Sequence, residues 1–337
     1  MQVLVTGGAG FIGSHVVPYL LDRGHAVRVL DDLSSGRREH VPAGVDFREG
    51  SITDPDDVRA AVDRVQTVVH LAAIASVTQS IEAPSDTHAV NLAGTIGLAE
   101  AASAAGVTKL VYASSAAVYG AIEREVHRED DQPAPITPYA IDKLTGEHYL
   151  RFFARQHGLD VRALRFFNVY GPRQLPSSPY AGVIARFATA LLHDEPVTVF
   201  GDGEQTRDFI AVDDVATIVT RHAEQAVAPG QAQVMNVCNS TRTSLRDLIE
   251  QLSLATSRAP VVRYEPARDG DIRHSRGSDE RLTAWFAERP RTGLAEGLAR
   301  VLDWMRAAEV ASDRDPSGAS PRGPRIPRSP RGPRIPR

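Results

Sequence analysis

The first thirteen residues constrain the fold more than any other segment. An apolar run from Val3 to Thr6 leads directly into Gly7-Gly-Ala-Gly-Phe-Ile-Gly13, and a helical pattern follows at once. Because glycine has no Cβ atom, such a loop can turn tightly, approach a pyrophosphate and let the next helix pack on a sheet. The helix N-terminus then faces the anion. The pattern alone is common, but its place between a strand and a helix predicts a dinucleotide-binding unit.

Two acids, Asp31 and Asp32, follow the next predicted strand, about twenty residues after the glycines. An acid at this point accepts hydrogen bonds from both ribose hydroxyls and repels a 2′-phosphate, which favours NAD over NADP. Arg37 and Arg38 are contrary evidence, because they favour NADP. The alternative interpretation is a structural glycine turn followed by solvated carboxylates.

Short β-rich runs alternate with helical patterns through the first half of the chain, which predicts a parallel sheet with helices on both faces. The predicted strands are Val3–Thr6, Val27–Leu30, Thr67–Leu71, Lys109–Ala113 and Val161–Phe166. The predicted helices between them include Phe11–Arg23, Ser85–Ala105 and Pro138–His157. Pro18 lies inside the first helix, where it removes the hydrogen bond to the Ser14 carbonyl. The expected fold class is α/β, a Rossmann doubly wound parallel sheet with a smaller C-terminal substrate-binding α/β lid.

The pattern becomes irregular beyond about Arg173, and helical patterns return at Val212–Ala226, Ser244–Leu252 and Leu294–Arg306. A lid over the carboxyl edge of the sheet fits this better than a second independent core. We therefore expect an NAD-binding domain over residues 1–173, with later elements returning to it, and a mainly substrate-binding domain over residues 174–311.

The chain is acidic except at its end. Its 337 residues include 38 basic and 42 acidic side chains, a formal charge of −4. Residues 321–337 hold six arginines and no acid, so 32 basic residues face 42 acidic ones upstream, a charge of −10. Such a body repels nucleic acid. We expect a small-molecule substrate and no nucleic-acid partner.

The last residues repeat themselves, because Pro321–Arg328 recurs as Pro330–Arg337 after Ser329. Dense proline blocks helix, and one isoleucine per copy cannot offset the entropy of ordering the chain. Residues 312–337 are therefore predicted to be a disordered tail. The arginines either form a patch for an anionic partner or belong to a passive extension.

Composition excludes several other classes. The longest nearly unbroken apolar stretch, Val68 to Val77, contains His70 and Ser76 and falls short of the ~20 apolar residues of a membrane span. No basic segment leads into an apolar helix with a cleavage site, so we expect no membrane association and a cytoplasmic location. The single cysteine, Cys238, permits no internal disulfide and no cysteine-based zinc cluster, and we expect no metal.

A candidate catalytic pair opens one helix. Thr137 and Pro138 are an N-cap and a first-position proline, and Tyr139 and Lys143 then lie four residues apart on one face. A nearby ammonium and a bound nicotinamide cation both stabilise a phenolate, so Tyr139 could take a proton from a hydroxyl while hydride leaves the same carbon for NAD. Lys143 would lower the tyrosine pKa and hold a nicotinamide ribose hydroxyl. Alone, the pair is more typical of a surface tyrosine packed on a lysine stem.

The serines that precede this helix favour the catalytic interpretation. Ser114 and Ser115 end the predicted strand Lys109–Ala113, at the carboxyl edge where ligands bind in such sheets. Ser115 could then bridge the substrate hydroxyl and Tyr139.

With these motifs in place, the sequence resembles the extended short-chain dehydrogenase/reductase family, in particular its NAD-dependent nucleotide-sugar epimerases and dehydratases of the UDP-glucose 4-epimerase type. The resemblance covers about Met1 to Arg306 and excludes the tail. It rests on Thr6-Gly-Gly-Ala-Gly-Phe-Ile-Gly13, His70-Leu-Ala-Ala73, Asn91-Leu-Ala-Gly-Thr95, Ser114-Ser115, Tyr139-x-x-x-Lys143, Arg165-Phe-Phe-Asn-Val-Tyr-Gly-Pro-Arg173 and Gly201-Asp-Gly-Glu-Gln-Thr-Arg-Asp208.

The resemblance implies an NAD-dependent enzyme that acts on a nucleotide-diphosphate sugar, most typically a UDP-hexose, and forms a homodimer through two long alanine-rich helices. The catalytic residues it implies are Ser115, Tyr139 and Lys143. The NAD-binding residues it implies are Gly7, Gly10, Phe11, Ile12, Gly13, Asp31, Asp32, Ser35, Gly36, Ser51, Ile52, Leu71, Ala72, Ala73, Asn91, Tyr139, Lys143 and Phe166. The substrate-binding residues it implies are Ser115, Ala116, Ala117, Tyr139, Asn168, Val183, Thr198, Phe200, Arg207, Arg268, Asp271 and Ser275.

Within the second set, Asn168 would meet a phosphate, Arg207 and Arg268 would clamp the diphosphate, and Asp271 would take a ribose hydroxyl.

Three departures from the family pattern sharpen the expectation. Relatives that dehydrate or decarboxylate carry an acid just before the Val-Tyr-Gly triplet, where this chain has Ala117, so elimination lacks its acid/base partner. Epimerisation at C4 needs none, because hydride leaves, the 4-keto sugar turns over and hydride returns. Ser51 replaces an aspartate that contacts the adenine amine and can still accept one hydrogen bond. Ser275 aligns with a gatekeeper that is small in relatives admitting N-acetylhexosamines.

Other functions remain open from the sequence. A heptose 6-epimerase also suits Ser-Ser-Ala-Ala followed by Tyr-Gly, although it prefers NADP, and a uronic acid 4-epimerase is a further alternative. A non-catalytic NAD sensor would keep the fold, but it would be expected to lose Ser115, Tyr139 or Lys143, and all three are present.

Overall fold

The computed structural model describes residues 1–122, 124–174, 182–226, 229–267, 272–286 and 289–314. Its main body is a seven-stranded parallel sheet with the strand order β11-β6-β5-β4-β1-β2-β3. The strands are β1 (Gln2–Thr6), β2 (Ala26–Asp31), β3 (Asp46–Glu49), β4 (Thr67–His70), β5 (Lys109–Ser115), β6 (Asp160–Phe166) and β11 (Ala232–Val237). The predicted doubly wound α/β fold is confirmed.

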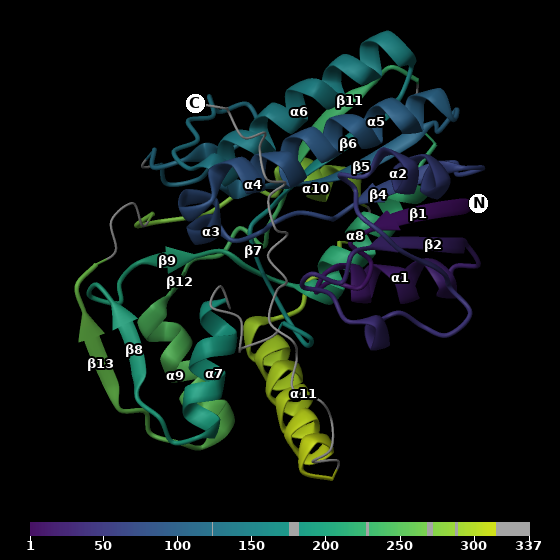
Figure 1. The fold of residues 1–337 in the computed structure, drawn as a ribbon. Helices are drawn as coiled ribbons and strands as arrows, with labels where there is room; N and C mark the ends of the chain where they lie inside the picture. Colours follow the sequence, from purple (N-terminus) through teal and green to yellow (C-terminus); the bar gives the residue numbers. More distant parts are fainter. Residues whose placement is uncertain (123, 175–181, 227–228, 268–271, 287–288, 315–337) are drawn as a thin grey trace, which may run out of the picture.

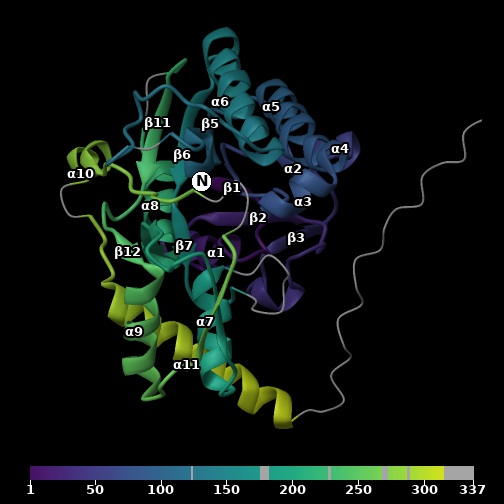
Figure 2. The ribbon, with the colours of Figure 1, turned by 90° about the vertical axis from the view of Figure 1, so that its left-hand side faces the viewer.

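Helices cover both faces of this sheet (Figures 1 and 2). One face carries α1 (Gly13–Asp22), α8 (Val212–Glu224) and α10 (Glu280–Trp285), and the other carries α2 (Pro55–Val62), α5 (Gly94–Ala104) and α6 (Pro138–His157). Val16 and Leu20 of α1 are fully buried on the first face, and Leu98 and Leu150 are fully buried on the second. Each such side chain contributes ~1.5–3 kcal/mol of burial free energy.

The remaining elements form a smaller unit beside the carboxyl edge of the sheet, in the lower half of Figure 1. Its helices are α7 (Val183–Leu192), α9 (Leu245–Thr256) and α11 (Leu294–Arg314), which share an apolar core with the pair β8 (Val197–Phe200) and β13 (Val262–Glu265). Two further pairs connect it to the main body, namely β7 (Asn168–Tyr170) with β10 (Phe209–Ala211), and β9 (Thr206–Arg207) with β12 (Thr243–Ser244). The elements α8 and β11 come later in the chain than this unit begins, yet they pack on the main sheet.

The predicted helix Ser85–Ala105 is not one regular helix. The chain forms α3 (Val77–Glu82), α4 (Pro84–His88), a π-helical turn over Ala89–Ala93 and then α5. The π turn places the amide of Asn91 against the preceding loop, where its Oδ1 accepts from Ile74 N at 2.8 Å and its Nδ2 donates to Ile74 O at 2.9 Å. These long-range contacts explain the interruption, which local propensity does not indicate.

The last helix is longer than predicted. The structure continues α11 to Arg314, past the predicted end at Arg306 and past Ser312, where disorder was expected to begin. Residues 307–314 contain neither glycine nor proline, so nothing in them ends the helix before Pro316. The rest of the predicted tail lies outside the described residues.

The carbonyl that Pro18 leaves without a helical donor is bound by another side chain. Pro18 cannot donate to the Ser14 carbonyl, and the Arg173 guanidinium donates to that oxygen instead, at 2.6 Å. The neighbouring His15 ring lies 3.0 Å from the Pro172 carbonyl and 3.0 Å from an Asp213 carboxylate oxygen. The carbonyl that proline leaves unpaired thus fixes the segment after β7 against the first helix.

Among the helices that the structure describes, none combines the length and apolar character needed to cross a membrane.

Candidate active site

The glycine-rich turn after β1 is shaped by contacts that exclude a side chain. Gly7 has φ +71°, and a Cβ there would lie 2.7 Å from Ala72 N. A Cβ on Gly13 would lie 2.2 Å from the Gly7 carbonyl oxygen. The loop therefore folds back on itself tightly and meets the segment after β4, which only glycine permits at these positions.

An acid and two backbone amides give this turn the chemistry of a dinucleotide site. Asp31 is buried, and its carboxylate accepts from Ala9 N at 2.8 Å and from Leu33 N at 2.9 Å, with acceptor capacity left over. Burial raises the pKa of Asp31, and backbone hydrogen bonds oppose that shift. Within the described part of the chain, Phe11 N and Ile12 N donate to no protein acceptor, and they stand at the start of α1. Free amides for a pyrophosphate and a carboxylate for ribose hydroxyls fit NAD.

The other predicted cofactor residues lie along the same edge, because each follows a parallel strand. Phe166 ends β6, and Leu71, Ala72 and Ala73 follow β4. Asp31 ends β2 and binds the glycine-rich loop through Ala9 N, whereas the next residue, Asp32, is exposed and accepts from Ser34 N at 2.9 Å. Exposed Ser35 and half-buried Gly36 come next, and a Cβ on Gly36 would lie 2.9 Å from Asp31 Oδ1.

Ser51 and Ile52 follow β3, and the Ser51 hydroxyl is already engaged. Its Oγ accepts from Thr53 N at 3.2 Å and lies 2.8 Å from Thr53 Oγ1. If the Ser51 hydroxyl donates to Thr53 Oγ1, one acceptor position remains, which is the single contact predicted for an adenine amine. The Asn91 amide, by contrast, binds Ile74 through both its oxygen and its nitrogen, and this geometry supports a positioning role for that loop.

The predicted catalytic residues lie together where β5 ends and α6 begins. Thr137 caps α6 by accepting from Ala140 N at 3.3 Å, Pro138 is the first helical residue, and the predicted helix Pro138–His157 is confirmed at both ends. Lys143 is buried, and its Nζ donates to Ala113 O at 2.8 Å and lies 5.9 Å from the centroid of the Tyr139 ring. The ends of one strand and one helix thereby fix both side chains.

Burial sets the direction of the pKa shift of both side chains in this pair. Burial raises the pKa of the Tyr139 phenol, and a hydrogen bond with Ser115 opposes that shift. Burial lowers the pKa of Lys143 to about 8, against the effect of the Asp142 carboxylate. Lys143 is directed at a backbone carbonyl and also lies 4.9 Å from the centroid of the Tyr112 ring. Burial is thus the main cause of the pKa shift of Tyr139, and the lowering of this pKa by Lys143 stays a prediction.

The sequence analysis missed a buried ion pair whose acid lies one helical turn after Lys143 on α6. Glu147 and Arg165 are joined by two hydrogen bonds, Nε to Oε1 at 2.9 Å and Nη2 to Oε2 at 2.8 Å, and the Ser114 hydroxyl also donates to Glu147. Both charged side chains are buried. The signal was available, because Tyr139, Lys143 and Glu147 are spaced by four residues on one helix face.

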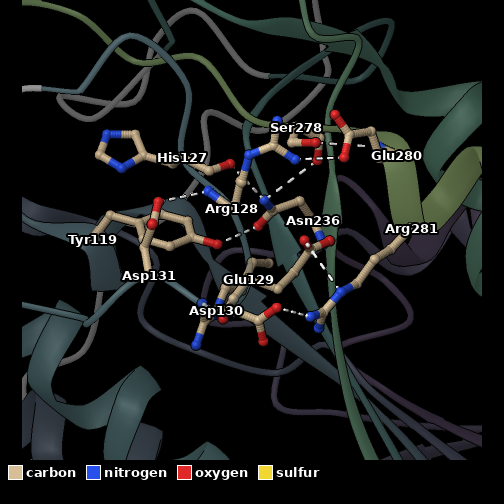
Figure 3. A network of polar contacts seen from close by, with 11 residues as sticks. Tyr119, His127, Arg128, Glu129, Asp130, Asp131, Asn236, Ser278, Glu280 and Arg281 are labelled. Atoms are coloured by element: carbon tan, nitrogen blue, oxygen red, sulfur yellow. Dashed lines mark hydrogen bonds and ion pairs between the residues drawn. The ribbon is translucent and has the colours of Figure 1, made fainter.

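A polar network around Tyr119 and Asn236, shown in Figure 3, lies next to this ion pair. The Arg165 guanidinium lies 4.9 Å from the Tyr119 ring centroid, and the Tyr119 hydroxyl donates to Asn236 Oδ1 at 2.6 Å. Asn236 donates in turn from Nδ2 to the His127 carbonyl at 3.0 Å and from its backbone to Glu129 at 2.9 Å. The network ties β5, β6 and β11 to the loop before α6.

The predicted substrate residues come from several elements of the smaller unit and its connections. Asn168 opens β7, Arg207 lies in β9, and Ser275 is bound to β9 because its backbone N–H donates to Thr206 O at 3.1 Å. Val183 begins α7, whereas Thr198 and Phe200 lie in β8, where Thr198 is exposed. Ala116 and Ala117 form the turn directly after Ser115. Arg268 and Asp271 lie outside the described residues.

The doubly wound sheet, the glycine turn with its acid, and a tyrosine and lysine one helical turn apart beside a serine define a class of protein, the short-chain dehydrogenases/reductases. The model of the NAD dependent epimerase/dehydratase family matches residues 3–238, more than half of the chain. The chain therefore belongs to that family, as the resemblance predicted.

Known relatives agree with this assignment. The chain is 39% identical over 313 residues to a UDP-glucose 4-epimerase of Mycolicibacterium smegmatis, an alignment that covers 91% of this chain and 99% of the relative. It is similar to the UDP-glucose 4-epimerase of Thermotoga maritima solved with UDP-glucose, with TM-score 0.86, 38% identity, and 92% and 100% of the two chains covered. The Thermus thermophilus UDP-glucose 4-epimerase solved with NAD gives TM-score 0.85, 40% identity, and coverage of 91% and 100%.

Proposed function

We propose that this protein is an NAD-dependent 4-epimerase of nucleotide-diphosphate hexoses, with UDP-glucose and UDP-galactose as its substrate pair. The observation that carries the proposal is the placement of Ser115, Tyr139 and Lys143 at the carboxyl edge of an NAD-type sheet, with alanine at positions 116 and 117. The similarity to UDP-glucose 4-epimerases along nearly the whole of their length supports it.

The residues of the chain provide proton transfer and positioning. Ser115 and Tyr139 hold the C4 hydroxyl of the sugar, and the Tyr139 oxygen accepts its proton and later returns it. Lys143 binds a ribose hydroxyl of the cofactor, and its ammonium stabilises charge on Tyr139. Bound NAD would supply the acceptor, and then the donor, of the hydride at C4. We propose that Gly7, Gly10, Phe11, Ile12 and Gly13 hold its pyrophosphate and that Asp31 holds its adenine ribose.

Elimination is disfavoured at this site by the side chains present. Removing a proton from C5, or protonating a leaving hydroxyl, needs an acid/base group in addition to Tyr139. In this chain the turn after Ser115 presents Ala116 and Ala117. Of the two carboxylates in the first half of α6, Asp142 lies 3.0 Å from the His88 ring and Glu147 is bound by Arg165. The turn after Ser115 therefore offers the 4-keto sugar no partner for elimination, and we propose that the sugar returns to a hydroxyl on either face.

The substrate is proposed to lie between the main sheet and the smaller unit. Residues 1–173 would bind NAD, and residues 174–311 would provide most of the contacts to the nucleotide sugar. Asn168, Arg207 and Arg268 would bind the diphosphate, and Asp271 would bind the nucleotide ribose, as the family resemblance implies. We further propose a cytoplasmic location.

The reaction itself tests this proposal. Purified protein incubated with UDP-galactose, without added reductant, is expected to yield UDP-glucose, as measured by chromatography of the nucleotide sugars. An unsaturated product, a 6-deoxy product or a pentose would contradict the assignment to epimerisation.

Substrate size is expected to depend on Ser275. This small, half-buried residue sits beside β9, so the site should admit N-acetylhexosamines. Ser275→Tyr is expected to lower the ratio of kcat/KM for UDP-N-acetylgalactosamine to that for UDP-galactose by about 10- to 100-fold, since filling the space for the acetyl group penalises only the larger substrate. Ser275→Ala, which keeps the space, serves as the control, and an unchanged ratio in the tyrosine variant would refute the gatekeeper role.

We also propose a homodimer that forms through α5 and α6. These two helices pack side by side, and α6 leaves Ile141, Tyr149 and Phe152 exposed by 47%, 43% and 51% along one face. Large apolar side chains at helical spacing on a surface indicate an interface.

Charge on this face is expected to separate the subunits. Ile141→Asp combined with Phe152→Asp should convert a dimer into a monomer in sedimentation velocity, because burying two carboxylates against an apolar partner is unfavourable. Leu254→Asp is the matched control, since Leu254 is 75% exposed on α9. A wild-type monomer, or a dimer that survives the double substitution, would rule out this interface.

A further inference from the structure

Asp208 is a buried acid whose contacts are almost entirely to backbone. It follows Arg207 and precedes β10, and its side chain has no exposed surface. Its Oδ1 accepts from Asn239 N at 2.9 Å and its Oδ2 accepts from Gly277 N at 3.1 Å. Backbone hydrogen bonds from Ser240 and Thr241 add to these. One carboxylate therefore joins the loop after β11 to the segment that contains Ser275.

The backbone of the same residue holds a third segment. The Asp208 carbonyl accepts from Asn168 N at 3.0 Å, at the start of the pair β7–β10. Thr206, two residues earlier, accepts from Ser275 N at 3.1 Å and donates to Arg273 O at 2.9 Å. The segment 206–208 thus contacts the segments of three predicted substrate residues. It contains Arg207, and its backbone binds Asn168 and Ser275.

Packing leaves this arrangement little freedom. A Cβ on Gly277 would lie 2.6 Å from Phe167 Cζ and 2.7 Å from Cys238 Sγ, so the backbone at 277 is pressed against both side chains. Burial raises the pKa of Asp208 to about 6, and the backbone amides oppose this shift. The ionised form of Asp208 is surrounded by backbone N–H groups, and its charge strengthens each of their hydrogen bonds.

We propose that Asp208 is a positioning residue for the nucleotide sugar: its carboxylate holds the 273–277 segment against β9 and β7, so that Asn168, Arg207 and Ser275 face a single substrate. This inference rests on the proposed function. It predicts an effect on substrate affinity, with little effect on the chemical step or on NAD binding, because Ser115, Tyr139, Lys143 and the glycine turn are held by other contacts.

The substitution Asp208→Asn tests it. Asparagine keeps the shape, but its NH2 group must face a backbone N–H at either Asn239 or Gly277, so one of the two segments loses its acceptor. The loss of one charge-assisted buried hydrogen bond corresponds to a KM for UDP-galactose and a Kd for UDP that rise by about 10- to 100-fold. We expect kcat to change less than about threefold on the same scale. Steady-state kinetics and calorimetric titration with UDP provide the two readouts.

Asp214→Asn is the matched control. Asp214 is also a buried carboxylate, and it accepts from Thr292 N at 2.7 Å and from Thr292 Oγ1 at 2.9 Å, away from the substrate residues. It should lose comparable thermal stability and keep its KM. Gly277→Ala moves the same segment without altering the charge of Asp208 and should also raise KM.

The outcomes distinguish the positioning role of Asp208 from the proposed epimerase function. A rise in KM and in Kd for Asp208→Asn and for Gly277→Ala, absent from Asp214→Asn, supports the positioning role. Unchanged KM in both variants, or a loss confined to kcat, overturns it while epimerisation by the wild type stands. A wild type that neither binds UDP nor converts UDP-galactose refutes the proposed function itself.

Discussion

Replacing Tyr139 by phenylalanine is expected to lower kcat for UDP-galactose epimerisation by about 10²- to 10⁴-fold, the range that one general acid/base group supplies. The phenol is the group at the end of β5 and the start of α6 that can exchange a proton with the C4 hydroxyl, and Ser115 hydrogen-bonds to it. Phenylalanine keeps the ring that packs beside Lys143. The glycine turn and Asp31 are untouched, so NAD should remain bound.

Two measurements on the same preparation check this result. Product formation gives kcat, and acid release followed by chromatography gives the NAD content. Tyr264→Phe is the control, because Tyr264 is 54% exposed in β13, and it should behave as the wild type. Substantial residual turnover by Tyr139→Phe would remove the proton-transfer role, and simultaneous loss of NAD would mean that the residue is structural.

Glu147→Gln is expected to destabilise the fold by ~3–5 kcal/mol, the effect of removing one partner of a buried ion pair. The Arg165 guanidinium has only 4% of its side chain exposed and would keep its charge without the carboxylate that it binds at 2.8 Å. Ser114 would lose its carboxylate acceptor in the same step. For a chain of this size, the midpoint of thermal unfolding should fall by ~5–10 °C in circular dichroism.

Substitution of an exposed glutamate is the control, because it removes the same charge without disturbing a buried ion pair. Glu100 lies exposed in α5, so Glu100→Gln should shift the midpoint by no more than the small changes typical of surface sites. If Glu147→Gln were equally silent, the ion pair would not support the junction of β5 with α6.

Local sequence signals predicted the elements whose ends are marked by specific residues. The start of α6 followed from Thr137 and Pro138, and the structure places the left-handed Gly158, with φ 72°, directly after its last residue. Strands β5 and β6 were visible as short β-rich runs, although Arg162 and Arg165 interrupt the apolar residues of β6. Strand β3 was missed, since Asp46–Glu49 contains three charged residues and lies at the edge of the sheet.

The missed features depend on residues that are distant in sequence. The π turn before α5 forms because Asn91 binds Ile74, and Arg173 acts on a carbonyl 159 positions earlier. The gathering of the candidate site residues at one edge of the sheet could be predicted, because parallel strands bring their carboxyl ends together. Asp208 could not, because its role depends on amides of two other loops that no periodic pattern connects to it.

The fate of the hydrogen at C4 tests the central claim most directly. If Tyr139 exchanges the hydroxyl proton while the C4 hydrogen never leaves the site, UDP-galactose carrying deuterium at C4 should give UDP-glucose that keeps the deuterium at C4, without any added nucleotide. Mass spectrometry and NMR of the product measure this. Loss of the deuterium to water, or a product altered at C5 or C6, would contradict the account.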